Sequence, residues 1–216
     1  MKDVGNNALW RIPQWFPDLN PAVESKLKSF HGDLLKFNLK LNLISRTTER
    51  DADEVHFADS IYGCRIVLAH CQAKSMMDIG AGNGLPGLIF ACLAPDRSFN
   101  LIESDGRKAE FLKHIAHSLG LSNVQVSSVR FENLKGTGAE TAVSRGFASI
   151  SKTLLACNRI FSVGGQFYHF KGSNWATEIA EVPPQLISVW TPVLAGEYTL
   201  PVSQARRAIV FTKKIS

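Results

Sequence analysis

The sequence predicts an α/β fold in which helices flank a seven-stranded, mostly parallel sheet and a helical extension precedes it. From residue 75 onward, short apolar segments of strand length alternate with segments whose apolar residues recur at helical spacing. This alternation favours a parallel sheet, because parallel strands need crossover connections that are usually helices. Glycine stands at every second position, 80, 82 and 84, directly after the first of these strands. A strand, a glycine-rich turn and a helix together predict a nucleotide-type binding site.

Two helices are predicted ahead of this turn. Asn20-Pro21 is typical of a helix start, with asparagine as the cap and proline in the first turn. Apolar residues then recur at spacings of three and four over a helix-length segment. Thr48 and Asp51 resemble a capping box, which predicts a second helix ending near residue 70.

The remaining elements are punctuated by proline and glycine. The helix after the glycine turn is expected to begin at Pro86, and the helix between the second and third strands to end at Gly120. Seven segments are expected to form strands: 75–79, 98–103, 124–129, 140–144, 165–170, 186–190 and 207–212.

Length and composition indicate one α/β unit. We expect residues 1–72 to form an N-terminal arm and helical extension packed on a core of residues 73–216. The net charge of +5 favours a polyanionic partner without requiring one. The four cysteines lack metal-binding spacing, so we expect reduced thiols and no metal site. Because no apolar run reaches about 18 residues and no signal segment is present, we expect a soluble, cytoplasmic protein without membrane contact. Nothing in the sequence suggests a coiled coil, and we expect a monomer.

Two carboxylates favour S-adenosylmethionine as the ligand of the turn. Gly82 to Gly87 literally matches the G-x-G-x-x-G of dinucleotide-binding proteins, a weak signal by itself. Asp78 closes the strand before the turn, where an acid would face the charged amino-acid end of the cofactor. Glu103 ends the next strand, where a carboxylate can accept both ribose hydroxyls. The competing interpretation of Glu103 is an acid that caps the following helix.

Two further positions follow from the ends of later strands. Phe131 and Glu132 come after the third strand, where an adenine would be sandwiched and its amino group met, although a surface loop with one buried phenylalanine explains the local pattern equally well. Arg145 ends the fourth strand. Since the carboxyl ends of parallel strands line the ligand crevice, we expect Arg145 to lie over the site.

Several motifs are rarer than a generic glycine turn, above all the Leu-Pro-Gly ending of the turn and the Arg-x-Phe-Ala-Ser stretch. Between about residues 30 and 172 they are Asn38-x-x-x-Asn42-Leu43, His56-Phe57-x-Asp59-Ser60, Asp78-Ile79-Gly80-x-Gly82-x-Gly84-Leu85-Pro86-Gly87, Glu103-Ser104-x-Gly106-Arg107-Lys108-x-x-Phe111-Leu112, Ser144-Arg145-x-Phe147-Ala148-Ser149 and Lys171-Gly172. In these motifs the chain resembles the small-subunit ribosomal RNA guanine-N7 methyltransferase family, also called glucose-inhibited division protein B. It departs from that pattern at Val55, where the family usually has arginine, and at Gly146, where alanine is common.

The resemblance implies a Rossmann-like class I methyltransferase that uses S-adenosylmethionine to methylate N7 of a guanine in 16S ribosomal RNA of the small subunit. The family's cofactor contacts carry over to Gly80, Leu85, Glu103, Phe131, Glu132 and Arg145, to which the turn adds Asp78, Gly82 and Gly84. Guanine N7 has a lone pair and no proton to lose, so we expect no catalytic proton transfer and interpret Arg145 as an orienting residue. His56 and Asp59, three apart on one helix face, are expected to pair and brace the helical region.

Basic residues offer a surface for RNA. Singly each is an ordinary solvated charge, but together they could hold phosphates and make binding salt-dependent. The candidates are Lys36, Lys40, Arg107, Lys108, Lys152, Lys171 and Arg207.

Three other functions stay open at this point. The first keeps the cofactor but has a small-molecule or protein acceptor. The second is a dinucleotide-dependent oxidoreductase, which fits the literal glycine pattern but not Asp78. The third is a non-catalytic ribosome-binding module, since a fold alone does not prove activity.

Overall fold

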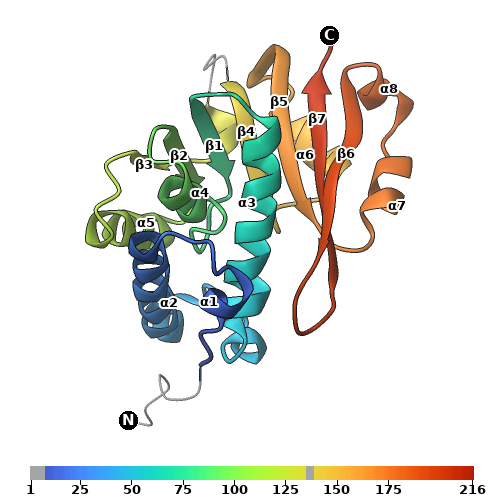
Figure 1. Ribbon diagram of the computed structural model, residues 1–216. Helices are drawn as coiled ribbons and strands as arrows, with labels where there is room; N and C mark the ends of the chain where they lie inside the picture. The colour runs from blue at the N-terminus through green and yellow to red at the C-terminus, as the bar shows by residue number, and fades with distance from the viewer. Residues whose placement is uncertain (1–7, 135–138) are drawn as a thin grey trace.

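A computed structural model describes residues 8–134 and 139–216 and is built around one seven-stranded sheet (Figure 1). The strand order is β3-β2-β1-β4-β5-β7-β6. The neighbouring strands β3, β2, β1, β4 and β5 are parallel, whereas β7 runs antiparallel to its neighbours β5 and β6. The predicted fold class is therefore confirmed. The strands are β1 (Ser75–Ile79), β2 (Ser98–Glu103), β3 (Val124–Ser128), β4 (Ala139–Arg145), β5 (Phe161–Lys171), β6 (Trp190–Thr199) and β7 (Arg206–Lys214).

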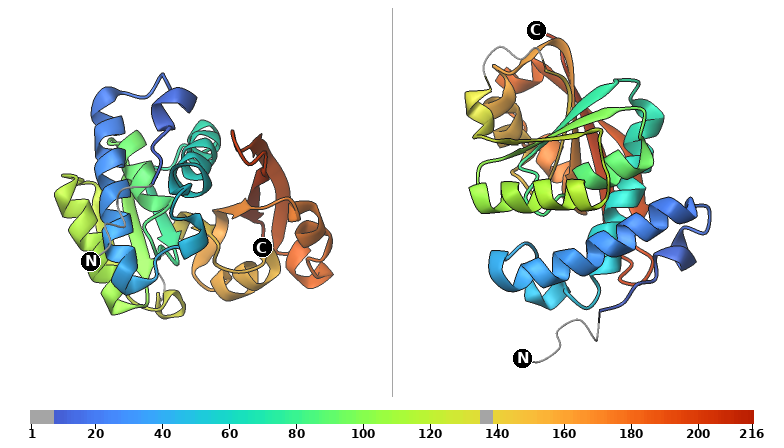
Figure 2. Two further views of the ribbon diagram at one scale, coloured as in Figure 1. Left: turned by 90° about the horizontal axis from the view of Figure 1, so that it is seen from below. Right: turned by 90° about the vertical axis from the view of Figure 1, so that its left-hand side faces the viewer.

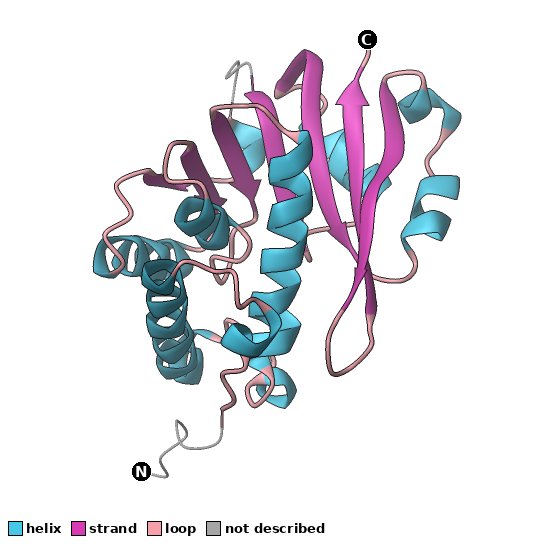
Figure 3. Ribbon diagram, in the orientation of Figure 1, coloured by secondary structure: helices cyan, strands magenta, loops and turns pink. Residues whose placement is uncertain are grey.

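Helices cover both faces of the sheet (Figures 2 and 3). They are α1 (Ile12–Trp15), α2 (Pro21–Leu41), α3 (Asp59–His70), α4 (Gly87–Leu93), α5 (Gly106–Ser118), α6 (Ile150–Cys157), α7 (Trp175–Ala180) and α8 (Pro184–Ile187), with 3-10 turns η2 (Arg46–Thr48) and η4 (Phe131–Asn133) and a π-helix η3 (Asp53–Ala58). Helices α2 to α5 share an apolar core with Val143 and Tyr168, and α6 shares another with Ala142 and Phe167. Successive strand residues thus face opposite layers. Within residues 8–134 and 139–216, no helix is both long and apolar enough to cross a membrane.

The two helix starts predicted near the N-terminus have different outcomes. The side chain of Asn20 accepts the Ala22 N–H at 2.8 Å, so the start of α2 is confirmed. The capping box at Thr48 is wrong. The Thr48 hydroxyl donates to the Ser45 carbonyl and contacts His56, and the following segment begins as the π-helix η3 before it continues as α3.

The strand predicted over 186–190 is also wrong. Pro184 stands in the first turn of α8, where proline is favoured, and the strand β6 begins only at Trp190. This strand contains Pro192 and Gly196, two residues that argue against a central strand. Both are tolerated because β6 is the edge of the sheet, paired on one side with β7.

Candidate functional site

The glycine turn lies at the carboxyl ends of the parallel strands, where it joins β1 to α4. Gly80, Gly82 and Gly84 have φ values of +73°, +51° and +87°, which disfavour residues with a side chain. A Cβ atom on Gly80 would lie 2.6 Å from the ring of Phe147, and one on Gly84 would lie 2.5 Å from Leu88. The turn therefore needs glycine both for its backbone and for the close approach of neighbouring side chains.

Two cavities meet at Gly80. The larger, which we call the main cavity, has a volume of about 440 Å³, and the smaller, the side cavity, about 180 Å³. The main cavity is lined by Leu43, Val55, His56, Asp59, Gly80, Ala81, Gly82, Asn83, Leu85, Glu103, Lys108, Arg145, Gly146 and Arg207. The side cavity is lined by Gly80, Ile102, Ser104, Val129, Arg130, Phe131, Glu132 and Phe147. Most of the predicted site residues are thus brought together around one turn.

Glu103 is held rigidly at the wall of the main cavity. It is 8 % exposed, and its Oε2 and Oε1 accept the N–H groups of Gly82 and Asp105 at 2.8 and 2.7 Å. Each carboxylate oxygen has a second lone pair, so two further hydroxyl donors can still be accepted. The helix cap that competed for this residue is supplied by Asp105, whose side chain accepts from the first turn of α5.

Asp78 lies beneath the turn instead of at a cavity wall. It is 3 % exposed, and its Oδ2 accepts the Gly87 N–H at 2.9 Å. Burial raises the pKa of Asp78 to about 7, although the bond from Gly87 favours its charged form. A Cβ atom on Gly87 would lie 2.7 Å from the same oxygen. In this structure Asp78 therefore fixes the exit of the turn into α4.

The side cavity is bounded by two aromatic rings. Phe131 and Phe147 meet edge to face, with ring centroids 5.2 Å apart and an interplanar angle of 83°. Phe131 opens the 3-10 turn η4 after β3, and Glu132 follows it. Aromatic walls with a carboxylate beside them suit a flat heterocycle that carries an amino group.

Arg145 binds residues of the π-helix η3 and of α3 at one wall of the main cavity. We call this wall, formed by His56, Asp59 and Arg145, the acceptor side. Its Nη1 lies 2.7 Å from Asp59 Oδ2, its Nη2 lies 3.0 Å from His56 Nδ1, and its side chain is 15 % exposed. The predicted pair of His56 and Asp59 is wrong, because the two side chains do not bind each other and Arg145 is their shared partner. The π-helix contributes as well, because the carbonyls of Val55 and His56 each lie 3.5 Å from the same Nη1. Sequence periodicity gave no sign of this π-helix.

His56 is neutral and both of its ring nitrogens are occupied. Arginine only donates, so Nδ1 accepts from Arg145 and the ring proton is on Nε2. The Thr48 hydroxyl, which donates to Ser45, accepts from Nε2 at 2.9 Å. Burial, reinforced by the charge of Arg145, lowers the pKa of His56 to about 3. The imidazole therefore has no free lone pair with which to take a proton.

Among the residues expected to face RNA, Lys108 and Arg207 line the main cavity. Lys36, Lys40, Arg107 and Lys152 are exposed away from it. Lys171 differs, because its side chain is 10 % exposed and binds the Ala148 carbonyl and Glu178 at 2.7 and 2.8 Å. Contact of Lys171 with RNA would require this ion pair to open.

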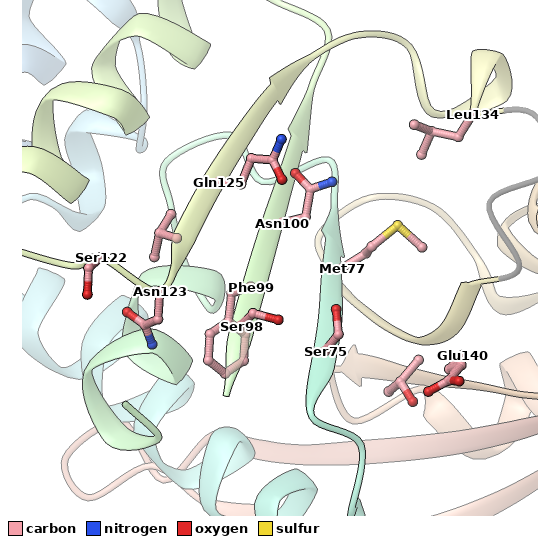
Figure 4. Close-up of a pocket in the computed structure, with 12 residues that line it drawn as sticks. Ser75, Met77, Ser98, Phe99, Asn100, Ser122, Asn123, Gln125, Leu134 and Glu140 are labelled. Atoms are coloured by element: carbon pink, nitrogen blue, oxygen red, sulfur yellow. The ribbon is translucent and has the colours of Figure 1, made fainter. Parts of the chain in front are cut away.

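A larger cavity is remote from this site. It has a volume of about 640 Å³ and lies toward the amino ends of β1, β2 and β3, where hydroxyl and amide side chains such as Ser75, Asn100 and Gln125 gather (Figure 4). Neighbouring Asn123 uses its amide to bind three backbone carbonyls, among them that of Ala91. The polar side chains of this cavity come from the amino ends of the strands, whereas the candidate site residues lie at the carboxyl ends.

Solved structures that share this fold include a methyltransferase. The 23S rRNA methyltransferase ErmE matches with a TM-score of 0.53 and 15% identity, covering 72% of this chain and 68% of its own. The YcgJ protein from Bacillus subtilis matches with a TM-score of 0.55 and 13% identity, covering 74% of this chain and all of its own (100%). These likenesses concern the fold alone.

Sequence relatives are much nearer. Ribosomal RNA small subunit methyltransferase G 3 from Bdellovibrio bacteriovorus is 43% identical over 208 residues, which are 96% of this chain and 94% of that protein. Ribosomal RNA small subunit methyltransferase G from Serratia proteamaculans is 33% identical over 192 residues, 84% of this chain and 90% of that protein. The family model GidB, rRNA small subunit methyltransferase G, matches residues 23–192. With its glycine turn, Glu103 and Arg145 all inside that match, the chain belongs to the rRNA small subunit methyltransferase G family.

Proposed function

We propose that the protein transfers the methyl group of S-adenosylmethionine to N7 of a guanine in 16S ribosomal RNA of the small subunit. The observation that carries the proposal is the meeting, in one cavity, of a glycine turn, a carboxylate with free lone pairs and an arginine neutralised by a buried aspartate. Membership of the family supports the same reaction and the same substrate.

The residues present fit the cofactor. The turn from Gly80 to Leu85 brings backbone close to the main cavity, and Glu103 has lone pairs left for two ribose hydroxyls. The side cavity, which is lined by the Phe131 and Phe147 rings and by Glu132, suits adenine packed against this aromatic wall. When bound, S-adenosylmethionine supplies an electrophilic methyl group on its sulfonium.

The acceptor side fits a nucleophile that loses no proton. His56 has no free lone pair, and Arg145 is protonated and paired, so neither acts as a base. N7 attacks with its own lone pair, and the chain's task is to orient the purine and exclude water, which is worth up to about 7–11 kcal/mol. Methylation leaves the purine cationic. Asp59 offsets the charge of Arg145 in part, since Arg207 shares the same carboxylate, and it holds the guanidinium in place beside the product.

The proposal is tested with tritiated S-adenosylmethionine and small subunits from a strain that lacks this gene. Borohydride and aniline then cleave the RNA where N7-methylguanine is present. Label in the RNA with scission at one site is the expected result. Cofactor binding without label in RNA or particles would refute the RNA assignment and favour a small-molecule or protein acceptor. We further propose that the protein acts as a cytoplasmic monomer, which light scattering checks for the oligomeric state.

A further inference from the structure

The hairpin formed by β6 and β7 reaches the acceptor side of the main cavity, although the family model ends at residue 192. In Figure 1 this hairpin extends beyond the sheet alongside the beginning of α3. Two of its side chains, Tyr198 and Arg207, contact the carboxylate of Asp59, which also binds Arg145.

Asp59 is saturated from two directions. Its Oδ2 binds Arg145 at 2.7 Å, while its Oδ1 lies 3.0 Å from the Tyr198 hydroxyl and 3.4 Å from Arg207 Nε. The Tyr198 hydroxyl is also 3.0 Å from the Asp59 carbonyl. The side chain of Arg207 is 29 % exposed and open to other anions, whereas Tyr198 is stacked on Tyr62 with ring centroids 5.5 Å apart. Tyr198 is therefore the more constant partner of Asp59.

A second contact fixes the tip of the same hairpin. Glu54, 2 % exposed in the π-helix, accepts the N–H groups of Val202 and Ser203 at 2.8 and 2.7 Å and the Ser203 hydroxyl at 2.9 Å. Buried carboxylates with several donors are strongly held, because an unpaired charge there is costly. The hairpin is thus locked to the segment that also presents His56 to Arg145.

We propose that Tyr198 is a positioning residue for methyl transfer, which holds Asp59 so that Arg145 keeps one orientation at the acceptor side of the main cavity. The proposal rests on the proposed function for its kinetic part. Removal of the Tyr198 hydroxyl leaves Oδ1 with Arg207 alone, at the longer distance, so the carboxylate and the guanidinium gain freedom.

The test variant is Tyr198→Phe, which removes only the hydroxyl. We expect kcat to fall by about tenfold with little change in the KM for S-adenosylmethionine, because a lost hydrogen bond to a charged group is of that size. Tyr168→Phe is the matched control, since it removes a buried tyrosine hydroxyl from β5, where the partner is Gln166. It should leave kcat unchanged. A fall in both variants alike, or in neither, would overturn the proposal.

Action through Asp59 has its own readout. In an Asp59→Asn background, Tyr198→Phe should reduce kcat much less than in the wild type, because the two residues act as a unit. Equal reductions in both backgrounds would mean that Tyr198 does not act through Asp59.

A measurement without turnover separates this proposal from the proposed function. In ¹⁵N-arginine-labelled protein, the Nη signals of Arg145, assigned with Arg145→Lys, should be resolved in the wild type and in Tyr168→Phe and averaged in Tyr198→Phe. Unchanged signals in Tyr198→Phe would overturn the positioning role even if RNA is methylated. Averaged signals in Tyr198→Phe would support the positioning role even if the wild type failed to label small subunits. Failure to label small subunits would refute only the proposed methyl transfer to RNA.

Discussion

Substituting glutamine for Glu103 tests the cofactor side of the site with a minimal change. Both carboxylate oxygens accept backbone N–H groups, Oε2 from Gly82 and Oε1 from Asp105, at 2.8 and 2.7 Å. Glutamine has one oxygen, so whichever way its amide is turned, its NH₂ group faces one of these two donors. One backbone hydrogen bond is lost and two donors face each other. One ribose hydroxyl loses its acceptor, and the acceptor of the other becomes uncharged.

The size of the effect follows from these contacts. A hydrogen bond to a charged group contributes about 1.5–3 kcal/mol, so the Kd for S-adenosylmethionine should rise by about 10- to 150-fold. The opposed donors should lower the free energy of unfolding by about 1–3 kcal/mol. Calorimetric titration with S-adenosylmethionine measures the first change, and unfolding in urea measures the second.

Glu110→Gln is the matched control. It makes the same chemical change on α5, where the Glu110 side chain is 72 % exposed and pairs with Lys113. We expect its Kd to equal that of the wild type. If Glu103→Gln also bound the cofactor as tightly as the wild type, Glu103 would not accept the ribose hydroxyls. The proposed orientation of the cofactor in the main cavity would then be wrong.

Three further predictions concern stability and RNA. Gly80→Ala places a methyl group 2.6 Å from a ring carbon at a φ of +73°, so unfolding in urea should show a loss of about 1–3 kcal/mol. Burial lowers the pKa of His31 to about 4 and that of His169 to about 3, so both stay neutral in the folded protein while the unfolded chain takes up protons below about pH 6.5. Their contribution to stability is complete above that pH and is lost as the pH falls toward 4, while protonation of buried Asp78 acts in the opposite direction over the same range. The imidazole signals are therefore followed by NMR, and a ring of either residue that titrates near pH 6.5 in the folded protein would contradict the prediction. Lys171→Met breaks an internal ion pair and should destabilise the fold by about 1–3 kcal/mol without altering the salt dependence of RNA affinity, whereas Arg207→Ala should reduce the salt slope by about one. Filter binding at several salt concentrations tells the last two apart.

The cofactor side of the site could be predicted because its signals are local. Three glycines, the acid that closes β1 and the acid that ends β2 lie within one short stretch of chain, and their spacing alone indicates a turn that binds a ligand. Glu103 lies at the wall of the main cavity, and its contact with the ribose of the cofactor stays a prediction. Its neighbour in this argument, Asp78, shows the limit: the sequence showed that an acid ends the strand, but not that its carboxylate turns under the loop to Gly87.

The edge of the sheet was harder to predict for a physical reason. Strand β6 carries Pro192 and Gly196, and its exposed and buried residues do not alternate cleanly, because an edge strand has only one neighbour. The π-helix left no trace either. The positions Val55, Ala58 and Tyr62 fit a regular helical period well enough, and the extra residue in the turn is visible only in the backbone.

The acceptor side depends on contacts between distant parts of the chain. Asp53, fully buried, binds the Arg11 side chain at 2.7 Å and so ties down the N-terminal arm, while its neighbour Glu54 holds the tip of the β6–β7 hairpin. The same segment continues into His56 and Asp59, whose partner Arg145 comes from β4. Four separate regions therefore contribute to the surroundings of Arg145, whereas the hydrogen bonds of the glycine turn join only β1, β2 and α4. Because these contacts join distant parts of the chain, local spacing in the sequence does not predict them. For the same reason, loss of the β6–β7 hairpin should reduce methyl transfer more than it weakens binding of the cofactor.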